Sequence, residues 1–190
     1  LKNKEFITFI LLSSGSVYQQ NKNKILKESA SLISKNSKNK GYDKGKLLTE
    51  LDILKKEKLF KKIIILRGFT FIGQFYESNS HFFISQLLNA IKKNKKIFKI
   101  SSDGSICRSY LYAIDAAIII IKSIFYAHKN IYNLGSNEYL KIKDIDKIIK
   151  NKLHKKIKFQ YLDVIPKPYD RGTYLPNINN VLKHFKIKKL

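Results

Sequence analysis

The chain of 190 residues contains no methionine, no tryptophan and only one cysteine, Cys107. A single cysteine excludes an internal disulfide and agrees with a reducing compartment, so we expect a cytoplasmic protein. Long apolar runs are also missing. The longest, residues 116–121, falls far short of the ~20 residues that a membrane-spanning helix needs, and we expect no membrane partner.

The first residue is Leu1, and no methionine occurs anywhere after it. A native reading frame should begin with methionine. We therefore expect that an N-terminal segment is missing, as in a truncated reading frame, a split reading frame or a processed product.

Acidic residues are scarce: the chain has 14 of them against 38 basic residues, for a formal net charge of +24. A charge of that size attracts nucleic acid through its field alone. Arginine, however, occurs only at positions 67, 108 and 171, and the lysines are spread along the chain without an aromatic-interleaved stripe. We favour a background compositional bias and do not expect nucleic acid as a partner.

The eight glycines are scattered, and none opens a strand-to-helix turn with G-x-G-x-x-G spacing. That spacing places the pyrophosphate of a dinucleotide on a helix N-terminus. The chain by itself therefore lacks the phosphate-binding loop of a dinucleotide-binding fold. The histidines and the cysteine show no metal-ligand spacing, so we expect no metal site.

Short aliphatic segments alternate with helical patterns along the chain. Continuous apolar runs predict strands at residues 6–12, 62–66, 97–100, 131–134 and 157–162. Apolar residues that recur on one face predict helices at residues 42–58, 81–92, 140–153 and 180–185. Asp115 is expected to cap a further helix that ends at Ala127, and residues 21–40 predict a polar surface connection. This alternation predicts an α/β fold with a parallel sheet.

Serines and a tyrosine–lysine pair form the candidate site. Ser13, Ser14 and Ser16 follow the first strand, at the carboxyl end where open α/β sheets bind their ligands. Tyr42 and Lys46 are four residues apart at the start of the next helix, so they share one face. Tyr-x-x-x-Lys alone is a weak signal, because about two chance matches are expected from residue usage. The preceding strand and serines single out Tyr42.

Four further segments complete a pattern that follows the order of one enzyme family. They are Arg67-Gly68-Phe69-Thr70-Phe71-Ile72-Gly73, Asp103-Gly104-Ser105 with Arg108-Ser109-Tyr110-Leu111-Tyr112, Ile131-Tyr132-Asn133-Leu134-Gly135-Ser136, and Tyr174-Leu175-Pro176-Asn177. With these segments the chain resembles, over nearly its whole length, the extended short-chain dehydrogenase/reductase family. These are NAD-dependent epimerases and dehydratases that act on nucleotide sugars.

The resemblance implies an α/β chain that forms the C-terminal part of a Rossmann-type parallel sheet with a smaller α/β substrate-binding region. Residues 1–75 would end the NAD-binding domain, whose first strands and glycine-rich loop are absent. Residues 110–136 would supply a helix and strand that return to that sheet. Residues 76–109 and 137–190 would form the substrate-binding region. The resemblance also implies a homodimer formed through the helix that carries Tyr42.

The resemblance also implies roles for individual residues. The catalytic residues would be Ser14, Tyr42 and Lys46. Contacts with NAD or NADP would come from Ser13, Tyr42, Lys46 and Phe69, and contacts with a nucleotide-sugar substrate from Ser16, Thr70 and Arg108. A tyrosine is a poor base at its free pKa of about 10, and a cation one helical turn away favours its phenolate. The planar guanidinium of Arg108 would suit the substrate diphosphate.

The chain departs from the family pattern after the catalytic hydroxyl. The dehydratase and decarboxylase branches carry an acidic residue one or two positions later, where this chain has Gly15 and Ser16. This difference favours epimerase or ketoreductase chemistry. In addition, Thr70 replaces an asparagine that faces the substrate in the family. Two alternatives stay open: a truncated or split remnant without independent activity, and a basic nucleic-acid-binding protein.

Overall fold

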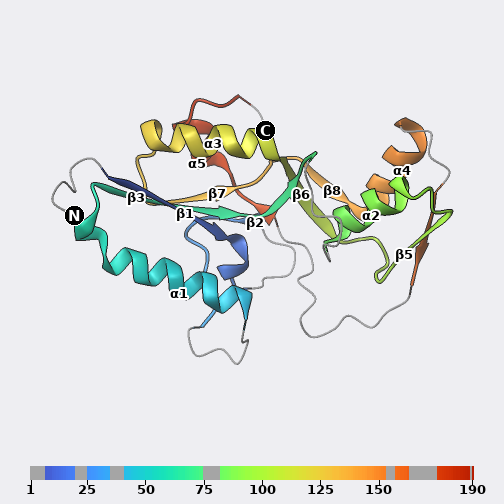
Figure 1. The fold of residues 1–190 in the computed structure, drawn as a ribbon, viewed down its shortest axis with the longest axis horizontal. Coiled ribbons are helices and arrows are strands. Elements are labelled where there is room, and N and C mark those ends of the chain that lie inside the picture. The colour runs from blue at the N-terminus through green and yellow to red at the C-terminus, as the bar shows by residue number, and fades with distance from the viewer. Residues whose placement is uncertain are drawn as a thin grey trace.

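A three-stranded parallel sheet organises the chain in the computed structural model, which describes residues 7–19, 25–34, 41–74, 82–152, 157–162, 175–188 and 190. Its strands, in the order β1-β3-β7, are β1 (Thr8–Ser14), β3 (Lys62–Gly68) and β7 (Ile131–Leu134). Figure 1 shows α1 (Tyr42–Lys55) on one side of this sheet, and α3 (Ala113–Tyr126) and α5 (Asn179–His184) on the other. The expected α/β fold with a parallel sheet is confirmed.

The register of the first two strands brings their carboxyl ends together. β1 and β3 pair from Thr8 opposite Lys62 to Ser14 opposite Gly68. The aliphatic residues of β3 are buried because helices cover both faces of the sheet: Ile63, Ile64, Ile65 and Leu66. A strand of this kind carries a continuous apolar run, which is the pattern that predicted it.

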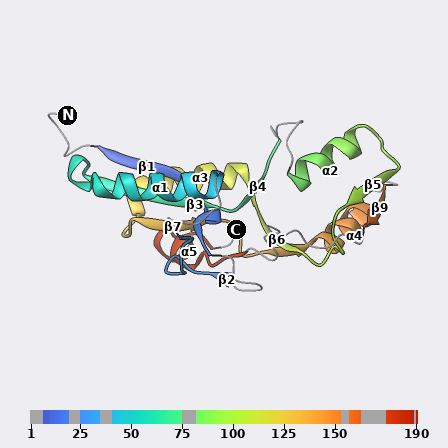
Figure 2. The same cartoon turned by 90° about the horizontal axis from the view of Figure 1, so that it is seen from below.

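A second core lies at the other end of the molecule (Figure 2). It contains α2 (Phe83–Lys92), β5 (Ile97–Ile100), α4 (Ile142–Lys152) and β9 (Lys158–Tyr161). The two strands pair in parallel, and the ring centroids of Phe98 and Phe159 lie 5.6 Å apart. A mixed sheet of β4 (Thr70–Ile72), β6 (Cys107–Tyr112) and β8 (Tyr139–Lys141) lies between the two cores in Figure 2.

The N-terminal part holds three short elements besides β1. They are the 3₁₀ helices η2 (Gly15–Val17) and η3 (Glu57–Leu59), and β2 (Ile25–Leu26), which pairs in parallel with β10 (Leu175–Pro176). Leu26 is buried, so the connection expected over residues 21–40 does not run wholly on the surface. That prediction is wrong because it depends on a partner strand some 150 residues away in the chain, which no local pattern reveals.

Two predicted helix starts are also wrong. Asp115 does not cap its helix: α3 begins at Ala113, and Asp115 lies in the first turn. There its negative charge interacts favourably with the positive end of the helix dipole without serving as the cap. The helix expected from residue 140 begins at Ile142, because Tyr139–Lys141 pair antiparallel with β6.

The expected segments do not coincide with the two cores. Residues 137–190 contribute to both, since α5 packs on β7 whereas α4 lies in the second core. The two cores do not test which segments bind NAD and which bind the substrate. The division at residues 75, 109 and 136 stays a prediction. Phe6 and His81, at which two expected elements begin, lie outside the described residues. No helix in the part that the structure describes is long and apolar enough to cross a membrane.

The hydroxyl group of Tyr132 connects α5 to the sheet through hydrogen bonds. Tyr132 on β7 is fully buried, and its hydroxyl oxygen accepts the backbone N–H groups of His128 and Lys129 at 2.8 and 3.1 Å. Nδ1 of His184 on α5 lies 2.8 Å from the same oxygen. Since both lone pairs of the hydroxyl are used, its proton is donated to His184, which must then be neutral at Nδ1.

The charge environment of His184 also favours the neutral ring. Burial lowers the pKa of His184, and the neighbouring His128, Lys129 and Lys183 lower it further, whereas Glu28 acts in the opposite direction. A histidine with a lowered folded-state pKa stabilises the fold fully above its unfolded pKa of about 6.5. This stabilisation is lost as the pH falls through the folded-state pKa.

We therefore expect His184→Gln to weaken the dependence of stability on acid. Glutamine keeps an acceptor for the Tyr132 hydroxyl but cannot be protonated. Urea unfolding at several pH values between about 7 and 5 should show a smaller loss of unfolding free energy in the variant than in the parent chain. His128→Gln is the comparison: it removes a neighbour that lowers the pKa of His184, so it should reduce the slope too, but less than His184→Gln. Equal slopes for His184→Gln and the parent would contradict this account.

Candidate active site

The carboxyl ends of β1 and β3 form the floor of the candidate site. Ser13 and Ser14 end β1, opposite Arg67 and Gly68 of β3. The backbone N–H of Ser16 donates to Oγ of Ser14 at 3.2 Å, so this hydroxyl caps η2. Because that bond uses only a lone pair of Ser14, its own hydrogen stays available for another oxygen.

A cleft of about 490 Å³ opens beside these strand ends. Five residues predicted from the sequence line it: Ser13, Ser14, Tyr42, Phe69 and Thr70. Apolar side chains, among them Phe71, Phe82 and Ile114, form much of the remaining wall. A cleft of this size, with a few polar groups in a mostly apolar wall, is typical of small-molecule sites. The structure thus brings the predicted serine and tyrosine residues to one cavity.

Three predicted residues do not line the cleft. Lys46 lies next to Tyr42 on α1, with its Nζ 5.6 Å from the centroid of the tyrosine ring. It donates to the carbonyl of Leu12 at 2.9 Å. Ser16 is buried in η2, and its Oγ finds no hydrogen-bond partner among the described residues. Arg108 lies on β6, where its Nη1 donates to the carbonyl of Cys107 at 2.9 Å.

A buried ion pair lies under the cleft, and sequence reasoning gave it no role. Arg67 of β3 donates through Nη2 and Nε to the carboxylate of Glu50 on α1, at distances from 2.7 to 3.2 Å. Each of the two side chains is only 2% exposed. The hydroxyl of Ser13 donates to the same carboxylate. One carboxylate therefore joins α1, β1 and β3.

The guanidinium of Arg67 has further partners. It lies 4.7 Å from the centroid of the Tyr18 ring, and its Nη1 donates to the carbonyl of Glu28 at 3.3 Å. Burial acts to lower the pKa of Arg67, but Glu50 and Tyr18 outweigh it and hold that pKa above its ordinary value. Burial raises the pKa of Tyr18 to about 12, although Arg67 acts in the opposite direction.

Two sequence signals could have indicated this pair. Glu50 stands four residues after Lys46 and eight after Tyr42, so all three lie on nearly the same face of α1. A carboxylate next to the apolar Leu47 and Leu51 is out of place unless it has a buried partner. Arg67 ends a continuous apolar strand in a chain with only three arginines.

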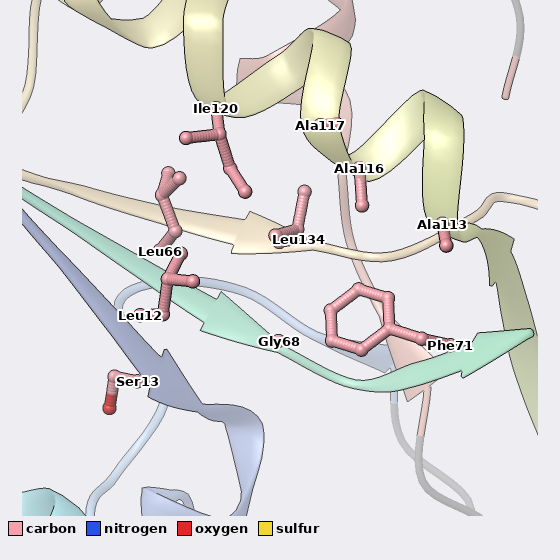
Figure 3. A pocket seen from close by; sticks show the side chains of 10 residues that line it. All are labelled: Leu12, Ser13, Leu66, Gly68, Phe71, Ala113, Ala116, Ala117, Ile120 and Leu134. Carbon is pink, nitrogen blue, oxygen red and sulfur yellow. The ribbon is translucent and has the colours of Figure 1, made fainter. Parts of the chain in front are cut away.

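A second, apolar hollow of about 300 Å³ lies between the sheet and α3 (Figure 3). Leu12, Leu66 and Leu134 approach it from the three strands, and Ala116, Ala117 and Ile120 from the helix. The ring of Phe71 lies over Gly68 and lines both the hollow and the cleft. Figure 3 shows the Ser13 hydroxyl directed away from α3, toward the opposite face of the sheet. Phe71 therefore separates an apolar space from a partly polar one.

No group of three or more histidine, cysteine, aspartate or glutamate side chains in the described ranges gathers closely enough to hold a metal ion.

A family model described as the NAD dependent epimerase/dehydratase family matches residues 1–135 of the chain. A search of curated proteins found no match. Among solved structures, UDP-N-acetylglucosamine 4-epimerase from Methanobrevibacter ruminantium M1, in complex with UDP-N-acetylmuramic acid, is 26% identical with a TM-score of 0.85. That comparison covers 100% of this chain and 59% of the epimerase.

Two other solved structures are more distant in sequence and show the same fold. UDP-glucose 4-epimerase from Thermotoga maritima, with UDP-glucose, is 17% identical with a TM-score of 0.79, covering 96% of this chain and 58% of its own. UDP-glucuronic acid 4-epimerase from Bacillus cereus, in complex with UDP-glucuronic acid and NAD, is 22% identical with a TM-score of 0.75, covering 100% and 59%. The chain thus spans less than two thirds of the length of each of these enzymes.

The contact between Gly68 and Phe71 predicts an energetic coupling. A Cβ atom at Gly68 would lie 2.8 Å from the Phe71 ring, so Gly68→Ala must displace the ring. In a Phe71→Ala background that clash is absent, and alanine should stabilise the chain by reducing the freedom of the unfolded state, by about 0.4–1 kcal/mol. We expect a double-mutant cycle measured by urea unfolding to give a coupling of about 0.5–3 kcal/mol.

Gly45→Ala is the matched control, because a Cβ atom at this helical position meets nothing within 4 Å. It should stabilise the chain equally with and without the Phe71 ring. A cycle with no coupling between positions 68 and 71 would mean that the ring does not rest on Gly68 in solution.

Proposed function

Because the chain belongs to the NAD-dependent epimerase/dehydratase family, we propose that it supplies the catalytic and substrate-binding part of a nucleotide-sugar epimerase or ketoreductase. One observation supports this proposal most. Ser14 and Tyr42 line a single cleft at the carboxyl ends of parallel strands, and the Lys46 ammonium lies 5.6 Å from the Tyr42 ring centroid. The three residues that we assign to one redox reaction thus lie near the carboxyl ends of the strands, where this fold binds ligands.

In the proposed reaction, Tyr42 is the general acid and base. It takes the proton from a sugar hydroxyl as the attached carbon becomes a carbonyl, and it returns the proton in the reverse step. Lys46 places its ammonium 5.6 Å from the centroid of the Tyr42 ring, one helical turn further along α1. Ser14 donates its available hydrogen to the reacting oxygen and holds that oxygen beside the tyrosine. The two residues after Ser14 are Gly15 and Ser16, neither of them acidic, which supports epimerase or ketoreductase chemistry over elimination.

The cleft fits part of the cofactor that the family uses. NAD, when bound, supplies the acceptor and donor of the hydride that the sugar carbon loses or gains. Ser13, Tyr42 and Phe69 line the cleft, and we assign them with Lys46 to the nicotinamide end. NADP would use the same residues. The chain has no glycine-rich turn for the phosphates, so we assign no residue to that end.

We assign the substrate to the part of the cleft that Thr70 lines. Thr70 lines the cavity and would contact the sugar, and Arg108 on β6 would bind the diphosphate through its planar guanidinium. Ser16 would contribute through the turn that it shares with Ser14. The family supports a nucleotide sugar as the substrate class. A homodimer through α1 and a cytoplasmic location stay predictions.

The test of the acid–base role uses Tyr42→Phe in a completed protein, in which the chain is produced together with the N-terminal segment that we expect to be missing. We expect NAD to bind this variant nearly as it binds the parent in calorimetry, while turnover of a UDP-sugar falls by about 10²–10⁴-fold. Tyr112→Phe is the matched control, since it removes a different hydroxyl from the same cleft. The control should keep the turnover of the parent. A Tyr42→Phe variant as active as the parent would eliminate Tyr42 as the acid–base residue.

The exposed edge of the sheet supports a second proposal, that a further segment must pair with β1 before the chain is active. In the part of the chain that the structure describes, β1 pairs only with β3, and Leu12 is 50% exposed. The apolar hollow opens beside Leu12, and α3 carries an exposed apolar stripe of Ile114, Ile118, Ile121 and Phe125. An unpaired edge next to exposed apolar surface requires cover in a stable protein.

We predict that the DNA preceding this reading frame encodes a G-x-x-G-x-x-G segment in frame or nearly so. Produced together with the chain, that segment should co-purify with it and raise its affinity for NAD, measured by calorimetry. Leu12→Lys places a charge on the proposed contact and should abolish co-purification without unfolding the chain. Absence of such a segment, or co-purification that Leu12→Lys leaves unchanged, would favour an inactive remnant.

A further inference from the structure

Helix α1 carries Tyr42 and Lys46, yet it buries little apolar surface. Only Leu47 and Glu50 are buried among its fourteen residues. Further aliphatic residues are only partly buried: Leu51, Ile53 and Leu54. Such apolar contacts are non-directional, so they specify the position of the helix weakly. We therefore look to the polar contacts of α1 for what sets its position along β1.

Those polar contacts are two hydrogen bonds between α1 and the end of β1. Lys46 donates to the carbonyl of Leu12, and one helical turn later Glu50 accepts the hydroxyl of Ser13. Ser14 is the next residue of the strand, and Tyr42 lies one turn before Lys46. These two hydrogen bonds therefore fix how Tyr42 faces Ser14 across the cleft.

Of the two residues of α1 that make these hydrogen bonds, Glu50 is the more firmly held. Arg67 holds its carboxylate through two nitrogens, and the arginine is itself fixed by Tyr18 and by the carbonyl of Glu28. A two-nitrogen guanidinium contact specifies orientation as well as distance. Separating these buried charges would leave both uncompensated, at a large cost in free energy.

We propose that Glu50 is a positioning residue, which through Arg67 and Ser13 holds Tyr42 and Lys46 in register with Ser14. This inference rests on the proposed function for its catalytic meaning, but its geometric content concerns only the folded chain. Glu50 touches no reacting atom in this account. Its role is to keep the lysine ammonium beside the strand end, where it donates a hydrogen bond to the Leu12 carbonyl.

The test separates position from stability with two variants. Glu50→Gln keeps the shape but loses the charge, and should lower the midpoint of urea unfolding because Arg67 then lacks its counter-ion. Glu50→Leu combined with Arg67→Met removes both charges, and well-packed apolar replacements of buried ion pairs are often as stable as the original. We therefore expect the double variant to recover the unfolding midpoint of the parent, or nearly so.

The readout of position is the ammonium resonance of Lys46 in a ¹H–¹⁵N spectrum, assigned by its disappearance in Lys46→Arg. In the parent, the bond to Leu12 should slow proton exchange and make this signal visible. We expect it to be lost in Glu50→Gln and also in the stable double variant. Asp52→Asn is the control, because Asp52 pairs with Lys56 on the exposed side of the same helix. Asp52→Asn should keep both the midpoint and the signal.

Retention of the Lys46 signal in either Glu50 variant would overturn the positioning role and leave Glu50 a purely stabilising residue. A double variant that does not fold would also overturn it, since the proposal requires fold and register to be separable. Neither measurement uses NAD, a sugar or turnover. A negative result here therefore leaves the proposed function standing, and an inactive enzyme leaves this inference standing.

Discussion

The ion pair between Glu50 and Arg67 is the interaction on which the rest of the site depends. Two opposite charges, each 2% exposed, must stay together because neither can recover its hydration inside the protein. Their pairing fixes the distance between α1 and β3, and the Ser13 hydroxyl adds β1 to the same carboxylate. The side of the cleft formed by α1, β1 and β3 is therefore held by charge, whereas the opposite face of the sheet packs against α3 through aliphatic side chains.

From Arg67 the polar contacts continue to the C-terminal part of the chain. Tyr18 lies against the guanidinium and donates to Oδ1 of Asn133 at 2.7 Å. The amide of Asn133 donates in turn to the carbonyls of Leu26 and Asn177, which belong to segments distant in the sequence. A buried asparagine with all these bonds satisfied specifies one arrangement of the segments around it. This explains how β2 and β10, with two residues each, hold a defined register.

Local patterns predicted those features of the chain that local physics decides. The continuous apolar run of β3 and the spacing of Tyr42 and Lys46 on α1 needed no tertiary information, and the strand-end rule brought Ser14 and Tyr42 to one cleft. Features that depend on partners far along the chain were missed. The pairing of β2 with β10 is one, and the pairing of Glu50 with Arg67 is another, because only the fold brings β3 back beneath α1. Asp115 was misassigned since a charge in the first helical turn and a capping side chain look alike in sequence.

The cleft and the open edge of the sheet meet at one residue. The carbonyl of Leu12 accepts the Lys46 ammonium, while the Leu12 side chain is half exposed at the free edge of β1 and lines the apolar hollow. Anything that pairs with β1 at this edge must act on the strand that anchors the lysine. Phe71 and Gly68, together with Ser13 and Ala113, line both the hollow and the polar cleft. Completion of the sheet and organisation of the proposed catalytic residues are therefore physically linked, because both act through the last residues of strand β1.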